Sequence, residues 1–436
     1  MALRLETSDP AFSDAFDLFV AKSREQKAGV DKVVGEILSE VKERGDEAVI
    51  DYTRRFDRHD VTTDGFEFSQ DEITTAEQEC DDQVLGAIKD AEQRVRAYHE
   101  RQMPLGMNFR DSSGVELGYR YTAVESAGLY IPGGTAALFS SILMNAIPAK
   151  VAGVDKLVAT MPTPDGGISP LMLATCRIAG VDTVYRLGGA QAIAALAYGT
   201  DTILPVDKIA GPGNIYVTTA KRMVFGTVGV DMIAGPSEVT IVADDNNDPE
   251  WIAADLLAQA EHDVSSRSVL ITDDHEFATA VEDAIEKYLK VLPRASTAGK
   301  SWADNGGIFV VDDISLSPML VNQIAPEHLQ LSVSEYEPLL AAVRHAGSIF
   351  VGRYTPEAIG DYIAGPSHVL PTSGSARFSS GLSVFDFLKR TSIINCSAGG
   401  LGIIGPKALV MARAEDLEAH AMSVDLRLNK LSDTGG

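Results

Sequence analysis

The pattern of apolar and polar positions changes character near residue 125. Before this point, segments such as DKVVGEILSEVKERGDEAVIDYTRRFD repeat apolar residues at helical spacing between charged ones, which predicts mostly helical structure. From Tyr130 onward, short apolar runs of strand length end in Gly or Pro turns, and Ala-rich helical stretches lie between them. The runs are AGLYIPGG, KLVATMP, TVYRLGG and KIAGPG. This alternation is typical of a parallel α/β sheet.

A second series of strand-length runs follows, again separated by helical stretches: SEVTIVADD, SVLITDD, GGIFVVDD and GSIFVGRY. We therefore expect two α/β sheet domains. The last part of the chain departs from this pattern. GPKALVMARAEDLEAHAMSVDLRLNK indicates one amphipathic helical region with no strand to which it returns. Such a tail either caps its own subunit or reaches across to a partner.

Composition narrows the possible partners and compartments. The 436 residues, 45% apolar and 23% charged, are typical of a globular protein with more than one domain. A net charge of −25 disfavours binding to nucleic acid or to an anionic membrane surface. The N-terminus lacks the apolar core of a secretory signal, and no apolar run approaches the roughly 20 residues of a membrane helix.

The three cysteines, Cys80, Cys176 and Cys396, are far apart and form no C-x-x-C pair. This argues against a disulfide framework and against thiolate-bound zinc, and it fits a reducing cytoplasm. Any metal ion must then be held by nitrogen and oxygen atoms.

Three glycine-containing loops follow predicted strands: YIPGGTA, RLGGAQA and AGPGNIY. Ligands of parallel α/β sheets bind where such loops lead into helices, and a helix N-terminus suits a pyrophosphate. GPGNIY matches the first half of the dinucleotide fingerprint, and Asp231 lies 20 residues after Gly211. However, Tyr216 takes the place of the last glycine, and Asp231 is expected at the start of a strand. The usual fingerprint is therefore absent, and plain tight turns explain these glycines equally well.

Two segments carry polar side chains suited to metal binding or acid–base chemistry. In LLAQAEHDVSS, Gln259 and His262 are three residues apart and share a helical face. They could form half of a metal site or simply the polar edge of a helix. NQIAPEHLQL places Glu327 beside His328 after a proline, where we expect a loop to enter a helix. Both residue types perform acid–base catalysis near neutral pH. Alternatively, Glu327 is a first-turn acid favoured by the helix dipole and His328 a hydrogen-bonded structural residue.

Further candidates lie in loops and in the tail. AIGDYIAGPSHVLPT contains Asp361 and His368, and IAGPSEV contains Ser237, whose ordinary role would be in a turn or cap. RAEDLEAHAMS contains Glu415 and His420, which could equally belong to a solvated helix face. Two oxygen and two nitrogen ligands for zinc or another borderline divalent ion would come from Gln259, His262, Asp361 and His420. Spacing alone does not show that they meet.

Long runs of the sequence closely resemble the histidinol dehydrogenase family, in order and nearly without interruption from about residue 5 to residue 425. They include YIPGGTAALFSSILMNAIPAKVAGV, RLGGAQAIAALAYGT, DKIAGPGNIYVTTAKRMVFG, DMIAGPSEV, DLLAQAEHD, APEHL, GDYIAGPSHVLPT and RFSSGLSVFDFLKRTS. The resemblance implies two incomplete Rossmann-like parallel-sheet domains without the usual dinucleotide fingerprint, small helical extensions at both ends, and an intertwined homodimer.

The expected division of the chain has four parts. Residues 1–24 form an N-terminal helical extension, and residues 25–129 with 238–382 form a discontinuous first α/β domain that carries most metal and catalytic residues. Residues 130–237 form a second, NAD-binding α/β domain. Residues 383–436 form a C-terminal helical tail that reaches the partner subunit.

Residue by residue, the resemblance implies one zinc ion per subunit, bound by Gln259, His262, Asp361 and His420. It implies that Glu327 and His328 are catalytic and that NAD+ is bound by Tyr130, Gln191 and Asn214. Substrate would be bound by Ser237, Gln259, His262, His328, Asp361, Glu415 and His420. Because the tail of family members crosses the dimer, His420 and Glu415 would complete the site of the partner.

The implied reaction is the last step of histidine biosynthesis in the cytoplasm. L-histidinol is oxidised through L-histidinal to L-histidine, with two NAD+ and one water. His328 would take the alcohol proton, Glu327 would activate the water, and Glu415 would accept a hydrogen bond from the imidazole. Phe139 and Ser367 replace a proline and an asparagine of the family, which affects loop shape more than chemistry.

Two other hypotheses remain open from the sequence: a related dehydrogenase for another small polar alcohol, and a catalytically silent protein that binds nucleotide or metal. The Glu327–His328 pair and the complete ligand set count against the second.

Overall fold

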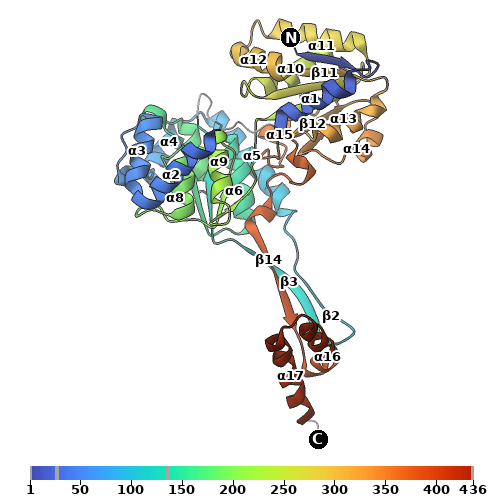
Figure 1. Cartoon of the computed structure of the whole chain (residues 1–436). Helices are drawn as coiled ribbons and strands as arrows, with labels where there is room; N and C mark the ends of the chain where they lie inside the picture. Colours follow the sequence, from blue (N-terminus) through green and yellow to red (C-terminus); the bar gives the residue numbers. More distant parts are fainter. Residues whose placement is uncertain (1, 25–28, 134–137, 434–436) are drawn as a thin grey trace. The chain divides into compact units, whose positions relative to one another are not determined.

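The computed structural model describes residues 2–24, 29–133 and 138–433. The chain divides into two compact units (Figure 1). The first comprises Met1–Gln102 with Val124–Phe387, and the second comprises Met103–Ala123 with Leu388–Gly436.

The first unit contains a six-stranded sheet in the order β1-β11-β10-β9-β12-β13, in which every neighbouring pair is parallel. Its strands are β1 (Leu3–Glu6), β9 (Glu238–Ala243), β10 (Arg267–Thr272), β11 (Gly307–Val310), β12 (His328–Ser332) and β13 (Ser348–Val351). Consecutive side chains of the buried strands β9, β10 and β11 point to opposite faces, so each of these three strands contributes to two separate cores.

Helices cover both faces of this sheet (Figure 1). One core joins Ile241 and Leu270 to α10 (Pro249–Ala260), α11 (His275–Tyr288) and α12 (Ala295–Asn305). The opposite core joins Val242 and Phe309 to α1 (Phe12–Arg24), α13 (Ser317–Ile324) and α14 (Glu337–Ala342). The short helix α15 (Glu357–Tyr362) follows β13.

A five-stranded parallel sheet in the order β6-β5-β4-β7-β8 also belongs to the first unit. Its strands are β4 (Ser126–Tyr130), β5 (Lys156–Thr160), β6 (Thr183–Tyr185), β7 (Lys208–Ala210) and β8 (Gly229–Val230). The strand order reverses between β4 and β7, and the crevice at such a switch point is where open α/β sheets bind ligands.

The helices around this sheet form two groups. Side chains of α2 (Val30–Arg44), α3 (Asp46–Asp57), α8 (Gly189–Tyr198) and α9 (Ile215–Val224) share one core. The other group is α4 (Gln70–Glu79), α5 (Asp82–Glu100), α6 (Ser140–Ala152) and α7 (Pro170–Ala179). Short 3₁₀ helices occur at Thr63–Gly65, Pro164–Gly166, Ile314–Leu316, Ser375–Arg377 and Val384–Phe387.

The second unit contains an antiparallel sheet in the order β14-β3-β2 and two helices. These elements are β2 (Met107–Arg110), β3 (Glu116–Ala123), β14 (Leu388–Asn395), α16 (Ala398–Ala414) and α17 (Glu418–Asp433). The two helices pack closely where Gly405 meets Val424 and Leu428, because a Cβ at Gly405 would lie 3.2 Å from each of these side chains.

The prediction of parallel α/β sheets with helical extensions at the ends is confirmed. The packing departs from the expected domain limits in three places. Helices α2 and α3, expected with residues 238–382, share a core with α8 and α9. Residues 1–24 add strand β1 to the six-stranded sheet, and the tail includes strand β14. An amphipathic pattern marks a helix or strand but does not identify the element it packs against. The limits of the domains as such stay a prediction.

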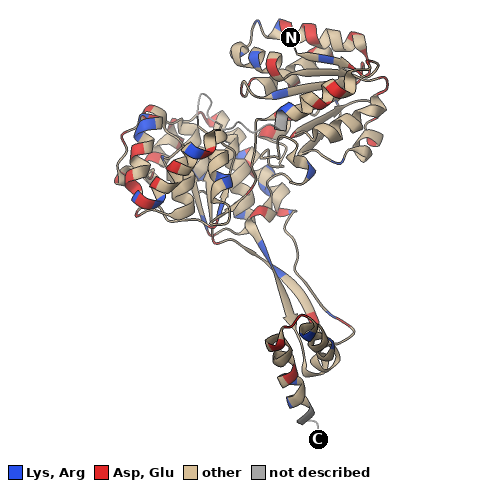
Figure 2. Ribbon diagram, viewed as in Figure 1, with Lys and Arg blue, Asp and Glu red and all other residues tan. Residues whose placement is uncertain are grey.

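Acidic and basic residues are interspersed along the outer helices of the first unit (Figure 2), although the chain is strongly acidic overall. Within the described residues, no helix is long and apolar enough to cross a membrane.

Candidate active site

Glu327 and His328 lie where the chain enters the middle of the six-stranded sheet. Helix α13 ends at Ile324, its C-cap residue Ala325 adopts a left-handed conformation with φ of 52°, and His328 is the first residue of β12. The expectation that this pair enters a helix is therefore wrong. The proline at 326 follows a terminated helix, and HLQLS then continues as a fully buried strand beside β9. Both residues are buried, with 5% and 4% of their surface exposed.

The ring of His328 is held by its Nδ1 atom. Nδ1 lies 3.2 Å from the backbone oxygen of Glu238, the first residue of the neighbouring strand β9. Because a carbonyl oxygen only accepts hydrogen bonds, this contact places a proton on Nδ1. Nε2, which has no hydrogen-bond partner among the described residues, is then the basic atom of the neutral ring. It lies 3.6 Å from an oxygen of Asp361.

Glu327 is fixed by the same neighbouring strand. Its Oε2 accepts a hydrogen bond of 2.9 Å from the backbone N–H of Glu238. The Glu238 carboxylate in turn accepts a hydrogen bond of 2.8 Å from the backbone N–H of Ser373. Burial raises the pKa of Glu327 to about 8, so this carboxyl group can exchange a proton near neutral pH.

Glu357 is a buried acid that the sequence analysis did not single out. Its Oε1 lies 3.5 Å from His328 Nδ1, and burial raises its pKa to about 8. The signal was present in the sequence, because Glu357 precedes Asp361 by four residues and so shares its face of α15.

His328 thus lies among several carboxyl groups. Burial by itself disfavours its charged form, but Glu357, Glu327 and Asp361 together raise its pKa well above the ordinary value. Burial also opposes ionisation of Asp361, yet the contact with His328 leaves the pKa of Asp361 lowered. His328 and Asp361 thus share one exchangeable proton, and this proton must leave the ring before Nε2 can accept another, so the neutral imidazole is the form that acts as a base.

The same cluster has the chemistry of a cation site. Ligand atoms of His328, Glu357 and Asp361 all lie within 4.8 Å of one another. Gln259 lies in the last turn of α10, and its buried Oε1 has no hydrogen-bond partner in the described chain. Helix α10 runs back from the carboxyl end of β9, so its C-terminus returns to the edge of the sheet where β9 and β12 begin.

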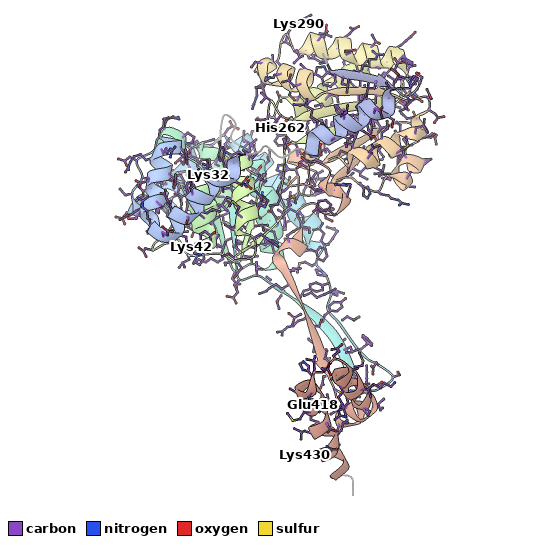
Figure 3. The ribbon with its side chains drawn as sticks, in the orientation of Figure 1. Lys32, Lys42, His262, Lys290, Glu418 and Lys430 are labelled. Atoms are coloured by element: carbon purple, nitrogen blue, oxygen red, sulfur yellow. The ribbon has the colours of Figure 1, made fainter. Side chains whose placement is uncertain are left out.

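His262 is the second residue after α10 and is labelled in Figure 3. Burial lowers the pKa of its imidazole, and the nearby charge of Asp361 offsets only part of this effect. Gln259, His262 and Asp361, three of the four expected zinc ligands, therefore belong to the first unit. His420, the fourth, lies near the start of α17, and Glu415 caps the end of α16. Both belong to the second unit and both are exposed. Their joining to the first three stays a prediction.

Two other candidates from the sequence border this cluster. His368 Nδ1 lies 3.0 Å from the backbone oxygen of Asp361, and its Nε2 lies 3.4 Å from Ser141 Oγ. Ser237 immediately precedes Glu238 and accepts a backbone hydrogen bond of 3.0 Å from Arg267. Ser367, one of the two departures from the family pattern, donates from its hydroxyl to the backbone oxygen of Met144 at 3.1 Å.

The three residues expected to contact NAD+ lie around the switch point of the five-stranded sheet. Tyr130 ends β4, and its hydroxyl oxygen accepts a hydrogen bond of 3.1 Å from the N–H of Gly189. Gln191 lies in the first turn of α8, with both polar atoms of its buried amide unpartnered in the described chain. Asn214 caps α9 by accepting from Tyr216 and Val217. Part of the YIPGGTA loop, residues 134–137, falls outside the described residues.

Asp231 has a different place from the one expected. It follows β8 instead of opening a strand, because β8 is only the two-residue edge strand Gly229–Val230. Its Oδ2 accepts a hydrogen bond of 2.8 Å from the N–H of Gly211. Its carboxylate is therefore used within the fold and is not presented to a ribose.

Comparison with known proteins agrees with this geometry. The family described as histidinol dehydrogenase matches residues 20–428. The histidinol dehydrogenase of Rhodospirillum rubrum is 58% identical over 431 residues, 99% of each chain. That of Ruegeria pomeroyi is 56% identical over 428 residues, 98% of this chain and 99% of the relative.

A crystal structure of histidinol dehydrogenase from Elizabethkingia anophelis superposes with a TM-score of 0.93 at 36% identity, over 99% of both chains. Sequence and fold thus agree over nearly the whole length. The chain belongs to the histidinol dehydrogenase family and is an NAD-dependent oxidoreductase.

Proposed function

We propose that this protein oxidises L-histidinol through L-histidinal to L-histidine, using two NAD+ and one water, in the last step of histidine biosynthesis. The observation that carries the proposal is the buried pair Glu327 and His328. Nε2 of the His328 ring lies 3.6 Å from a carboxylate oxygen of Asp361. A water-excluded acid–base pair beside an anionic group is what oxidation of an alcohol and then of an aldehyde hydrate requires.

Each residue of the pair has a separate role in the proposed reaction. His328 accepts the proton of the substrate hydroxyl at Nε2, because Nδ1 is committed to the backbone oxygen of Glu238. Glu327 acts in its ionised form as the base for the water that adds to the aldehyde. Both side chains lie at the start of β12 and contact Glu238 of the adjoining strand β9, which keeps them within reach of one substrate carbon without reorganisation.

Gln259, His262 and Asp361, together with His420, are the proposed ligands of one zinc ion per subunit. The unpartnered buried oxygen of Gln259 supports this set, since a buried acceptor without a donor is suited to a cation. Mixed imidazole and oxygen ligands fit zinc. Bound zinc would supply a Lewis-acidic point that orients the substrate. We propose that Ser237, Gln259, His262, His328, Asp361, Glu415 and His420 contact substrate.

Tyr130, Gln191 and Asn214 are the proposed contacts for NAD+, which accepts the electrons in both steps. The amide of Gln191 supports this assignment because its oxygen and nitrogen are both unpartnered. Tyr130 presents a buried hydroxyl whose pKa burial raises to about 12, so it acts as a neutral group toward the cofactor. Holding the aldehyde between the two steps would protect a reactive intermediate from solution.

We propose further that the protein is a cytoplasmic homodimer with shared sites, in which Glu415 and His420 complete the site of the partner. The second unit supports this because it exposes many apolar side chains, as interfaces between subunits do. These include Ile394 at 73%, Val410 at 70%, Met411 at 66% and Leu426 at 63% exposed. Glu418, at the start of α17, is labelled in Figure 3.

The decisive experiment measures NADH formation with L-histidinol, with and without a chelator. Two NADH per substrate, with loss of turnover on chelation and recovery on adding zinc, is the expected result. Turnover only with another small polar alcohol would favour a related dehydrogenase. Zinc binding without turnover of any amino alcohol would leave only a binding protein.

A further inference from the structure

The loop that connects β7 to α9 is held by a buried ion pair that has no part in the reaction described above. Lys221 on α9 and Asp231 after β8 form this pair, and their side chains are 3% and 0% exposed. Lys221 Nζ donates to the backbone oxygen of Gly211 at 2.8 Å, and Asp231 Oδ2 accepts from the backbone N–H of the same glycine at 2.8 Å. The two charges therefore hold both backbone groups of one residue.

Gly211 needs such partners because of its conformation. Its φ of +112° is accessible mainly to glycine, and a Cβ there would lie 2.2 Å from the backbone oxygen of Tyr130. The chain thus passes very close to β4 and turns away from regular pairing. Buried backbone groups in this position must be satisfied by side chains, and charged partners give the shorter, more directional bonds.

The residues that follow Gly211 form the expected cofactor contact. Gly213 packs on the ring of Tyr130, since a Cβ at Gly213 would lie 3.2 Å from Tyr130 Cε1. Asn214 then caps α9. Fixing Gly211 therefore fixes the distance between the Asn214 cap and the Tyr130 ring.

The same pair also anchors the segment that leads to the acid–base site. Residues 231–237 begin at Asp231 and end next to Glu238, which binds both Glu327 and His328. Thr218 Oγ1 lies within hydrogen-bonding distance of the backbone oxygens of Gly213 and Ala234, at 3.3 and 3.2 Å. The cofactor loop and this segment are thus tied together one turn before Lys221 on α9.

We propose that Lys221 and Asp231 are positioning residues for the dinucleotide, which hold the Gly211–Asn214 loop against Tyr130 in the geometry that binds NAD+. The inference rests on the proposed function, because it assigns NAD+ to this loop. In this proposal neither charge contacts the cofactor. Their effect is transmitted through Gly211.

The test compares K221M, D231N and the double variant K221M/D231N with R222M. Arg222 is the next residue on α9 and pairs with Asp31 at the surface at 2.7 Å, so R222M removes a cation from the same helix without touching the loop. The measurements are KM for NAD+, KM for L-histidinol, the Kd of NAD+ by calorimetry, and thermal unfolding.

K221M should raise KM and Kd for NAD+ by about tenfold or more, because the loop loses a buried donor, while KM for L-histidinol stays within about twofold. K221M should also unfold at lower temperature, since it leaves a buried carboxylate unpaired. The double variant removes both charges and should recover stability but not NAD+ affinity, because the Gly211 oxygen still lacks its donor. D231N keeps an acceptor for the Gly211 N–H and should show the smallest NAD+ effect.

Two results would overturn the proposal. One is NAD+ binding in K221M that matches R222M. The other is a double variant that regains NAD+ affinity together with stability, which would make the pair merely structural. Failure of the wild-type protein to oxidise L-histidinol would refute the proposed function instead, and the Kd of NAD+ would still decide the role of the pair.

Discussion

Replacement of Glu327 by glutamine separates the two oxidation steps. The amide has the shape of the carboxyl group and keeps an oxygen that can accept the 2.9 Å hydrogen bond from the Glu238 N–H, so the local structure should persist. What is lost is a base buried beside His328. We expect oxidation of L-histidinal to fall by about 10²- to 10⁴-fold, the usual contribution of a positioned base, and oxidation of L-histidinol to fall far less.

The pH dependence of aldehyde oxidation tests the same role of Glu327 in a second way. Only ionised Glu327 can act as a base, and burial raises its pKa to about 8, so the active fraction increases as the pH rises through that value. The ionised fraction is roughly one tenth at pH 7 and nine tenths at pH 9, so wild-type aldehyde oxidation should accelerate about tenfold over this interval. In E327Q this dependence should disappear.

The assay is single-turnover NADH formation, with L-histidinol and with L-histidinal as separate substrates, at several pH values. Glu337 on the surface of α14 provides the matched control, and E337Q should leave both steps unchanged. Equal loss of the two steps in E327Q, or an unchanged pH profile for the aldehyde, would refute water activation by Glu327.

Three other substitutions test the site and the fold. H262N should weaken zinc binding by at least about tenfold, as measured by metal content after dialysis, and unchanged zinc content would remove His262 from the ligand set. E415Q should raise KM for L-histidinol by roughly 10- to 100-fold through loss of a charge-assisted hydrogen bond worth about 1.5–3 kcal/mol, and an unaltered KM would exclude that contact. F309A should lower the free energy of unfolding by about 3–5 kcal/mol in urea titrations, because the ring is fully buried against Phe16 and Phe19; a loss below 1 kcal/mol would contradict this packing.

The fold class could be predicted because its signals are local. Apolar runs such as SVLITDD and GGIFVVDD are long enough for buried strands, and they alternate with helical stretches in a way that only parallel α/β layers accommodate. The residue types at Gln259, His262, Glu327, His328 and Asp361 likewise indicated metal and acid–base chemistry before any contact was known. The long resemblance to one family then turned a set of separate candidates into a single hypothesis.

Partners distant in sequence could not be predicted. Strand β14 went unrecognised because its partner β3 lies far earlier in the chain, and helices α2 and α3 carry no mark of the sheet that they cover. The spacing of Glu357 to Asp361 on α15 was visible in the sequence, but its contact with His328 was not. Asp231 was given the wrong relation to its strand because β8 has only two residues.

The sequence by itself determined the fold class, the family and the residue types of the site, because periodicity, turn residues and long motifs depend on neighbours along the chain. Only the tertiary structure decided that His328 opens a strand, which of its nitrogens is free, and that Lys221 and Asp231 hold Gly211. Those features depend on which buried groups meet across the sheet, where burial and proximity set both the protonation and the position of each side chain.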